Sequence, residues 1–338
     1  MRASRRRRSM AVAGCLAVLL AGCGTGADLA KTTGKRTTVP ATEGLDAGPE
    51  TGGSTPPPTG DDVFSSASLR RVNPCAIMDE ETMSGFGTPA RSRLRDYALC
   101  SNYMKDPGGR DLNFTMTIGD SSLARKAQGA LKIGGLPVAE SELDDKTACF
   151  VTAITETDPD RGITVQIGSD TPGGLCEPGR KLLETAVTKI RDSRPELDVR
   201  KGSLVDLDAC TVLDDSVVAA AIGDGPGKKP TGLHNCTYNT QGVTFRVEFS
   251  LGTDPDELAE AAKTTPVDLG GVRAQQRSES TSSTRCSLSW AHVPFEGAEG
   301  NAEVVKVDFT RYDPQAGEDA CAKVQTVAKA LLPKLPQK

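Results

Sequence analysis

Ten cysteines carry the clearest chemical signal in the chain, because thiols can form disulfides, bind metals or act in redox catalysis. Two lie near the N-terminus, and eight form two sets of four: Cys75, Cys100, Cys149 and Cys176, then Cys210, Cys236, Cys286 and Cys321. Metal binding and redox catalysis need close pairs such as Cys-Xaa-Xaa-Cys. No two cysteines lie closer than eight positions. We therefore predict structural disulfides, no metal site and no cofactor.

The pairing of the eight cysteines is open at the level of sequence. If bridges form within each set, three pairings remain for each. We favour neighbours in sequence, so that every bridge ties one helix to one strand. The predicted bonds are Cys75 with Cys100, Cys149 with Cys176, Cys210 with Cys236, and Cys286 with Cys321.

Other candidates for catalysis are few, and we predict no catalytic residue. His234 and His292 are the only imidazoles, and no Gly-Xaa-Ser-Xaa-Gly motif accompanies them, so we expect ordinary surface or strand-end residues. The run from Gly223 to Lys229 contains glycines and lysines but departs from phosphate-loop spacing, which favours a helix-to-strand loop.

Acidic pairs, a glycosylation sequon and a single tryptophan have simple structural interpretations. Adjacent acids point in different directions and usually mark turns or caps; the pairs are Asp61-Asp62, Asp144-Asp145 and Asp214-Asp215. Asn113-Phe114-Thr115 matches a glycosylation sequon, which carries little information on its own. Trp290 is expected in the core.

The N-terminus has the pattern of an export signal. Arginines precede an apolar stretch, Met10 to Leu20, that is too short to span a bilayer. It ends in Leu20-Ala21-Gly22-Cys23, which is similar to a bacterial lipobox. We predict that residues 1–22 are removed and that Cys23 is lipidated, with an ordinary signal peptide as the alternative. Residues 23–67, rich in Gly, Thr and Pro, are predicted to form a disordered tether.

Charge and composition limit the classes of partner. The formal net charge is −5, and loss of the signal removes five arginines and no acid, which leaves the mature chain more acidic. This argues against nucleic acid as a partner. It also argues against attachment to anionic lipid through a basic face, so contact with the membrane is expected through the acyl chains at Cys23.

The two cysteine sets indicate a duplicated domain. Their separations are 25, 49 and 27 residues in the first set and 26, 50 and 35 in the second. Asn73-Pro74-Cys75 matches Asp208-Ala209-Cys210, each opening a short helix with an acid four residues after the cysteine. We predict one domain over residues 68–197 and another over residues 203–335.

Hydrophobic periodicity gives the expected elements of each copy. Alternating runs at 112–118 and 243–251 predict strands, and residues 121–131 and 255–263 predict second helices. Apolar residues recur at helical spacing before residues 190 and 332, which predicts a long final helix in each copy. The expected order is helix, two strands, helix, three strands, helix, which gives an α+β fold with helices packed on an antiparallel sheet.

These features resemble a family of actinobacterial envelope lipoproteins known as domain of unknown function 3558. The shared features are the lipobox, the Asp/Asn-Xaa-Cys helix opener, a Cys-Xaa-Xaa-Tyr-like strand and a fourth cysteine that opens the last helix. The resemblance covers residues 68–195 and again 204–335. The first copy departs in having Asn102 where the second has Tyr238. Membership implies location and architecture but no activity.

We therefore expect a non-catalytic module on the outer face of the cell membrane. It is expected to bind a small ligand or an envelope protein, and a ligand pocket should recur at equivalent positions in both copies. The alternatives are an envelope hydrolase whose carboxylates meet only on folding, and a structural accessory subunit of an envelope complex.

Overall fold

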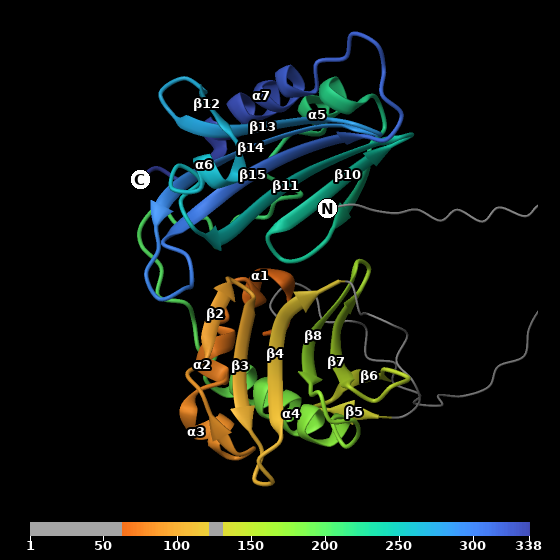
Figure 1. Ribbon diagram of the computed structural model, residues 1–338, viewed down its shortest axis with the longest axis vertical. Helices are drawn as coiled ribbons and strands as arrows, with labels where there is room; N and C mark the ends of the chain where they lie inside the picture. Colours follow the sequence, from red (N-terminus) through yellow and green to blue (C-terminus); the bar gives the residue numbers. More distant parts are fainter. Residues whose placement is uncertain (1–62, 122–130) are drawn as a thin grey trace, which may run out of the picture. The chain divides into compact units, whose positions relative to one another are not determined.

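The computed structural model describes residues 63–121 and 131–338 (Figure 1). The predicted signal peptide, Cys23 and most of the predicted tether lie outside the described residues, as do Asp61-Asp62 and nearly all of the helix predicted at 121–131. Among the described residues, none of the helices has both the length and the apolar character that a membrane span requires.

The first half, residues 63–197, is built around an antiparallel sheet with the order β1-β3-β4-β8-β7-β6-β5, and β2 pairs with β3. Three short helices precede the sheet and one long helix follows it. The strands are β1 (Thr88–Pro89), β2 (Arg93–Asp96), β3 (Leu99–Lys105), β4 (Asp111–Asp120), β5 (Lys132–Ile133), β6 (Leu136–Glu142), β7 (Ala148–Thr157) and β8 (Asp160–Gly168).

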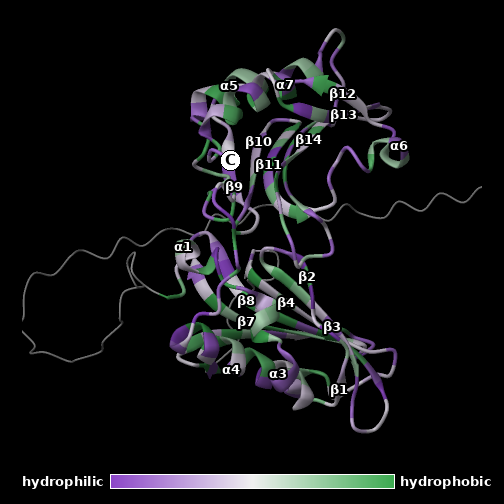
Figure 2. Cartoon of the chain, turned by 90° about the vertical axis from the view of Figure 1, so that its left-hand side faces the viewer, coloured by the Kyte–Doolittle hydropathy of each residue, from purple (hydrophilic) through white to green (hydrophobic). Residues whose placement is uncertain are grey.

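Alternation of side chains gives this sheet one apolar face. In β4, the side chains of Leu112, Phe114 and Met116 are buried, while the residues between them are only partly buried. Figure 2 shows hydrophobic and hydrophilic residues alternating along the strands. Helix α4 (Cys176–Asp192) covers the apolar face. Gly179 permits close packing, since a Cβ there would lie 2.5 Å from Ile167 Cδ1.

The short helices of the first half are α1 (Ser66–Leu69), α2 (Pro74–Ile77) and α3 (Glu80–Ser84). The Asn73 side chain accepts from the backbone N–H groups of Cys75 and Ala76, and Asp79 accepts from Thr82 N–H. Both caps satisfy amides that have no partner within a helix. The single short helix predicted to begin around Cys75 is therefore two successive short helices, α2 and α3.

The second half, residues 203–338, contains an antiparallel sheet with the order β12-β13-β14-β15-β11-β10-β9. Helix α7 packs on β14 and β15, and α5 packs beside α7 (Figure 1). The elements are α5 (Asp215–Ile222), β9 (Gly227–Pro230), β10 (Asn235–Thr240), β11 (Val243–Gly252), α6 (Ala259–Ala262), β12 (Thr265–Asp268), β13 (Arg273–Ser280), β14 (Thr284–Pro294), β15 (Ala302–Arg311), α7 (Ala320–Leu331) and the 3-10 turn η1 (Leu332–Lys334).

The four disulfides join the cysteines that were predicted to pair: Cys75–Cys100, Cys149–Cys176, Cys210–Cys236 and Cys286–Cys321. In three of them a cysteine within a helix (α2, α4 or α7) is bonded to a cysteine in a strand. The exception is Cys210, which lies in a turn before α5.

Antiparallel sheets with packed helices in two similar halves confirm the broad fold prediction, whereas its details need correction. The short helix predicted around Cys210 is a turn, and the helix begins at Asp215. The helix predicted over 255–263 is reduced to Ala259–Ala262. Extra short strands, among them β1, β9 and β12, pair at the sheet edges and lengthen the expected order of elements.

Each half also contributes a side chain to the core of the other. Tyr97, between β2 and β3, is 1% exposed and belongs to the core of the second half, where its ring lies 4.7 Å from the His234 ring. Leu233, before β10, is 3% exposed and belongs to the core of the first half. Gly119 makes room for it, because a Cβ at Gly119 would lie 2.3 Å from Leu233 Cγ.

Candidate functional site

A hollow of about 790 Å³ lies in the first half, on the sheet face opposite α4. We call it the first hollow. It is formed by β1, β3, β4 and the turn after β8, and five of its residues carry the argument below: Tyr103, Lys105, Asp111, Asn113 and Gly168. Its volume is in the range of small-molecule sites.

The floor of the first hollow follows from strand register. Tyr103 is paired with Asn113, and Asn113 is paired with Gly168, so the three positions form one row across β3, β4 and β8. Cross-strand partners point to the same face of a sheet. The neighbouring row, Phe114 with Ile167, points to the α4 side and is fully buried. Because Gly168 has no side chain, the row is open beside Asn113.

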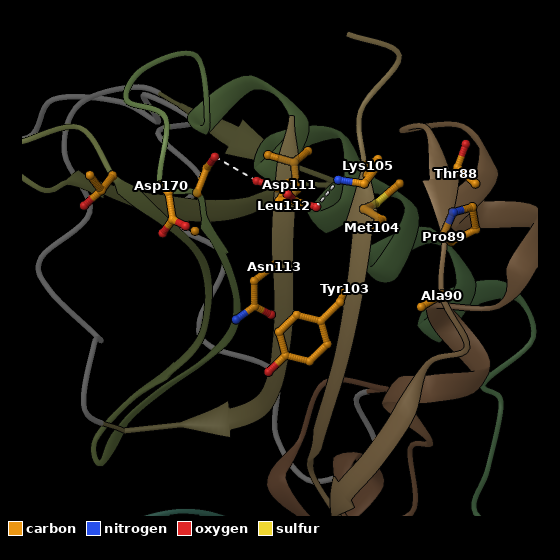
Figure 3. Close-up of a pocket in the computed structure, with 13 residues that line it drawn as sticks. Thr88, Pro89, Ala90, Tyr103, Met104, Lys105, Asp111, Leu112, Asn113 and Asp170 are labelled. Atoms are coloured by element: carbon orange, nitrogen blue, oxygen red, sulfur yellow. Dashed lines mark hydrogen bonds and ion pairs between the residues drawn. The ribbon is translucent and has the colours of Figure 1, made fainter. Parts of the chain in front are cut away.

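Two side chains offer binding chemistry in this row. The Tyr103 side chain is 49% exposed, so its ring is accessible to a ligand. Asn113 lies beside it, and Figure 3 shows the amide next to the ring. The Asn113 Oδ1 atom is buried and has no hydrogen-bond partner among the described residues. A buried acceptor of this kind favours a ligand that supplies an N–H or O–H donor.

Two of the three charged side chains that line the first hollow form an ion pair, and the third is Asp170. Lys105 Nζ lies 2.6 Å from Asp111 Oδ1 (Figure 3), and both side chains are exposed. The Ser169 hydroxyl donates to the backbone oxygen of Asp111 at 2.8 Å, which fixes the turn after β8 against β4. The lining therefore combines an aromatic ring, an amide and small side chains with a neutralised ion pair.

Comparisons with known proteins give no assignment for this arrangement. Neither a scan of protein-family models nor a search of curated proteins finds a match. Among solved structures, one from Bacteroides thetaiotaomicron is similar over 35% of this chain and 44% of that chain, with 17% identity and a TM-score of 0.23. The immunity protein TplEi of T6SS from Pseudomonas aeruginosa is similar over 72% and 94%, with 8% identity and a TM-score of 0.28. These scores are too low to support an argument.

The second half has a hollow on the equivalent face, as expected for a duplicated domain, but its chemistry differs. Cys100 and Cys236 are equivalent, and their cross-strand partners are Met116 and Val247. Three residues before these partners lie Asn113 and Thr244, which are therefore equivalent. Their own partners on the next strand, Gly168 and Thr310, are equivalent too. Both lie in a hollow of about 380 Å³, which we call the second hollow. It is lined by charged residues, so the two halves do not present the same site.

The two histidines lie at strand ends, one of the two positions expected for them, but both are buried rather than on the surface. His234 Nε2 lies 2.8 Å from the Val205 backbone oxygen, and His292 Nε2 lies 2.9 Å from that of Gly202. Burial lowers the pKa of His234 to about 4 and lowers the pKa of His292. Both imidazoles are therefore neutral at pH 7 and serve as interior hydrogen-bond donors.

The other residues that were considered from sequence lie in the core, in turns or in ion pairs. Trp290 is 2% exposed, which confirms the prediction that it lies in the core. Asp145 Oδ1 accepts from Thr147 N–H at 3.0 Å in a turn, and Asp215 forms an ion pair with Lys228. Gly223 ends α5 with φ 102° and the chain connects a helix to a strand, as predicted, but β9 already begins at Gly227, so the loop is shorter than expected.

One group of side chains, Glu140, Cys149 and Cys176, has the residue types and the spacing of metal ligands. Glu140 lies close to the sulfur atoms of Cys149 and Cys176. These sulfurs are joined in a disulfide, so they are not thiolates, and the Glu140 carboxylate is 2.5 Å from Arg180 Nη1. The group is a disulfide with a neighbouring ion pair rather than a set of metal ligands.

From sequence, Tyr103 was named only as part of a Cys-Xaa-Xaa-Tyr-like strand and Asn113 only as part of a sequon, and neither was predicted to bind a ligand. The available signal was the alternation in β4, which places Asn113 on the face away from the apolar residues Leu112 and Phe114. A tyrosine three residues after Cys100 falls on the same outer face of the neighbouring strand. Register between β3 and β4 was needed to bring the two together.

Proposed function

We propose that this chain is a lipid-anchored binding protein outside the cytoplasm, and that its first hollow holds a small uncharged polar ligand. The observation that carries the proposal is the row Tyr103, Asn113 and Gly168, where an exposed ring and an unpartnered amide oxygen lie beside an open position. Lipidation at Cys23 and kinship with the domain of unknown function 3558 lipoproteins are parts of this proposal.

The location rests on the disulfides. Four disulfides indicate an oxidising compartment, because thiols in the cytosol are kept reduced. An acidic chain gains little from an anionic membrane surface, so an acyl anchor at Cys23 accounts for attachment.

The class of ligand follows from the lining. Lys105 is paired with Asp111, and Asp170 adds a further carboxylate to the lining, so the hollow offers no free cation to an anionic ligand. The Tyr103 ring favours a flat apolar surface on the ligand, and Asn113 Oδ1 favours a hydroxyl or amide donor. Saccharides with N-acetyl groups combine these features, and triacetylchitotriose is a suitable probe.

The proposal is tested by calorimetry of the full chain with triacetylchitotriose and by native mass spectrometry for a co-purified ligand. Tyr103→Ala should weaken binding about tenfold or more. Gly168→Leu should block it, since a Cβ there meets nothing nearer than Thr147 O at 3.9 Å and the larger side chain can enter the hollow. Tyr312→Ala is the control, because this tyrosine of the second half is also exposed, at 59%, and lies outside the first hollow.

Two results would refute the site. One is unchanged binding in Gly168→Leu with an unchanged unfolding midpoint. The other is absence of any bound ligand by both methods, which would favour a protein partner.

The hydrolase alternative finds no specific support. Two carboxylates line the first hollow, Asp111 and Asp170. Asp111 is held by Lys105 at 2.6 Å, which neutralises the group that a general base would need to keep free.

A further inference from the structure

The second hollow concentrates positive charge in an acidic protein. Four of its side chains are cations and two are anions. The formal net charge of the whole chain is −5, so this local excess opposes the general balance. The six residues are Arg246, Arg277, Arg285, Lys306, Glu279 and Asp308.

Strand register places the cations on one face. Arg277 is paired with Ser287, Ser287 with Asp308, and Asp308 with Arg246, so one row crosses β13, β14, β15 and β11. Arg285 and Lys306 lie two residues from Ser287 and Asp308 in their own strands, and therefore point to the same face.

Two of the four cations already have anionic partners. Arg277 Nη2 lies 2.5 Å from Glu279 Oε1, and Lys306 Nζ lies 3.2 Å from Asp308 Oδ2. Among the described residues, Arg246 and Arg285 have no carboxylate within ion-pair distance. They lie in β11 and β14, with β15 between them and an offset of two residues along the strands, so their Cα atoms are about 12 Å apart. Both side chains are exposed and long enough to converge.

From this arrangement we propose that the second hollow binds a small ligand carrying at least two negative charges on phosphate groups, with Arg246 and Arg285 as the main contacts. Arginine presents a planar fork of donors that matches phosphate oxygens, and two such forks favour a dianion over a single charge. The hollow, about 380 Å³, accommodates a pyrophosphate or a small organic phosphate. This site is separate from the first hollow and does not depend on it.

Inorganic pyrophosphate is the probe, titrated into the full chain with calorimetry and with amide chemical shifts as readouts. We expect saturable binding that weakens as sodium chloride rises from 50 to 200 mM. Shifts should be confined to β11 and β13 to β15. Arg246→Gln with Arg285→Gln should lower the affinity at least tenfold. Arg273→Gln is the matched control, because this exposed arginine of β13 pairs with Asp256 outside the hollow.

Each other result overturns the proposal in a defined way. Equal loss in the Arg273→Gln control would indicate nonspecific charge attraction, and unchanged affinity in the double variant would exclude the site. Tighter binding of citrate than of pyrophosphate would assign the hollow to carboxylates. Binding to phosphatidylglycerol vesicles without binding to pyrophosphate would assign it to a membrane surface. Unchanged far-UV circular dichroism is required of every variant, and Arg246→Lys, which keeps the charge but loses the fork, should show an intermediate affinity.

Discussion

At the scale of single residues, Asp96 couples protonation to folding. Its Oδ1 atom accepts from the backbone N–H groups of Tyr97 and Leu251, each at 2.8 Å. Burial raises the pKa of this carboxyl from 3.8 to about 6, against the lowering effect of those two hydrogen bonds. Glu248 nearby raises the pKa further. The folded chain therefore favours the protonated form, and the contribution to stability is present below about pH 4 and lost as the pH rises through 6.

Asp96→Asn should stabilise the chain at neutral pH, because it removes a buried charge while an amide oxygen keeps both hydrogen bonds. The free energy of unfolding of the variant minus that of the wild type should rise by about 1 to 3 kcal/mol between pH 4 and pH 7. Urea unfolding at several pH values measures this difference. His234, whose pKa is lowered to about 4, imposes the opposite dependence in both proteins and cancels in the comparison. A difference that stays flat with pH would contradict the argument.

At the scale of elements, the disulfide Cys149–Cys176 fixes the start of α4 to β7. It closes a separation of 27 residues, and such a loop restricts the unfolded chain by about 3 to 4 kcal/mol on the chain-entropy model. Replacing both cysteines by alanine should lower the free energy of unfolding by this amount. Urea unfolding under oxidising conditions measures it. Reduced wild-type protein, in which all four disulfides are open, is the comparison. A decrease in the free energy of unfolding of less than 1 kcal/mol in the double variant would contradict the estimate.

Elements with a clear period could be predicted from the sequence, and short ones could not. The alternation of Leu112, Phe114 and Met116 fixed a strand because one face is buried. The edge strands β1 and β9 contain two and four residues, too few for a period to be detected. The site needed more than element prediction, because Tyr103 and Asn113 are ten residues apart and meet only through the register of β3 with β4.

At the scale of the whole described chain, each half places one side chain, Tyr97 or Leu233, in the core of the other half, and the sequence did not predict this. Leu233 lies in a run of glycine, proline and polar residues without periodicity, yet it is 3% exposed in the core of the first half. Arg70 secures the same segment, since its Nε donates to Leu233 O at 3.1 Å and its Nη2 lies 2.5 Å from Asp208 Oδ2. The stability of the first half therefore depends on residues that the second half supplies.

Leu233→Ala should accordingly destabilise the first half more than the second, although the substitution lies in the second. Removal of a buried leucine costs about 2 to 5 kcal/mol. Trp290, buried in the second half, reports that half by fluorescence, while far-UV circular dichroism reports both. In urea, we expect the circular dichroism of the variant to change before the fluorescence. Leu213→Ala, equally buried but within its own half, should instead move the fluorescence transition first. If both probes shift together in Leu233→Ala, the leucine stabilises one cooperative unit rather than the core of the first half.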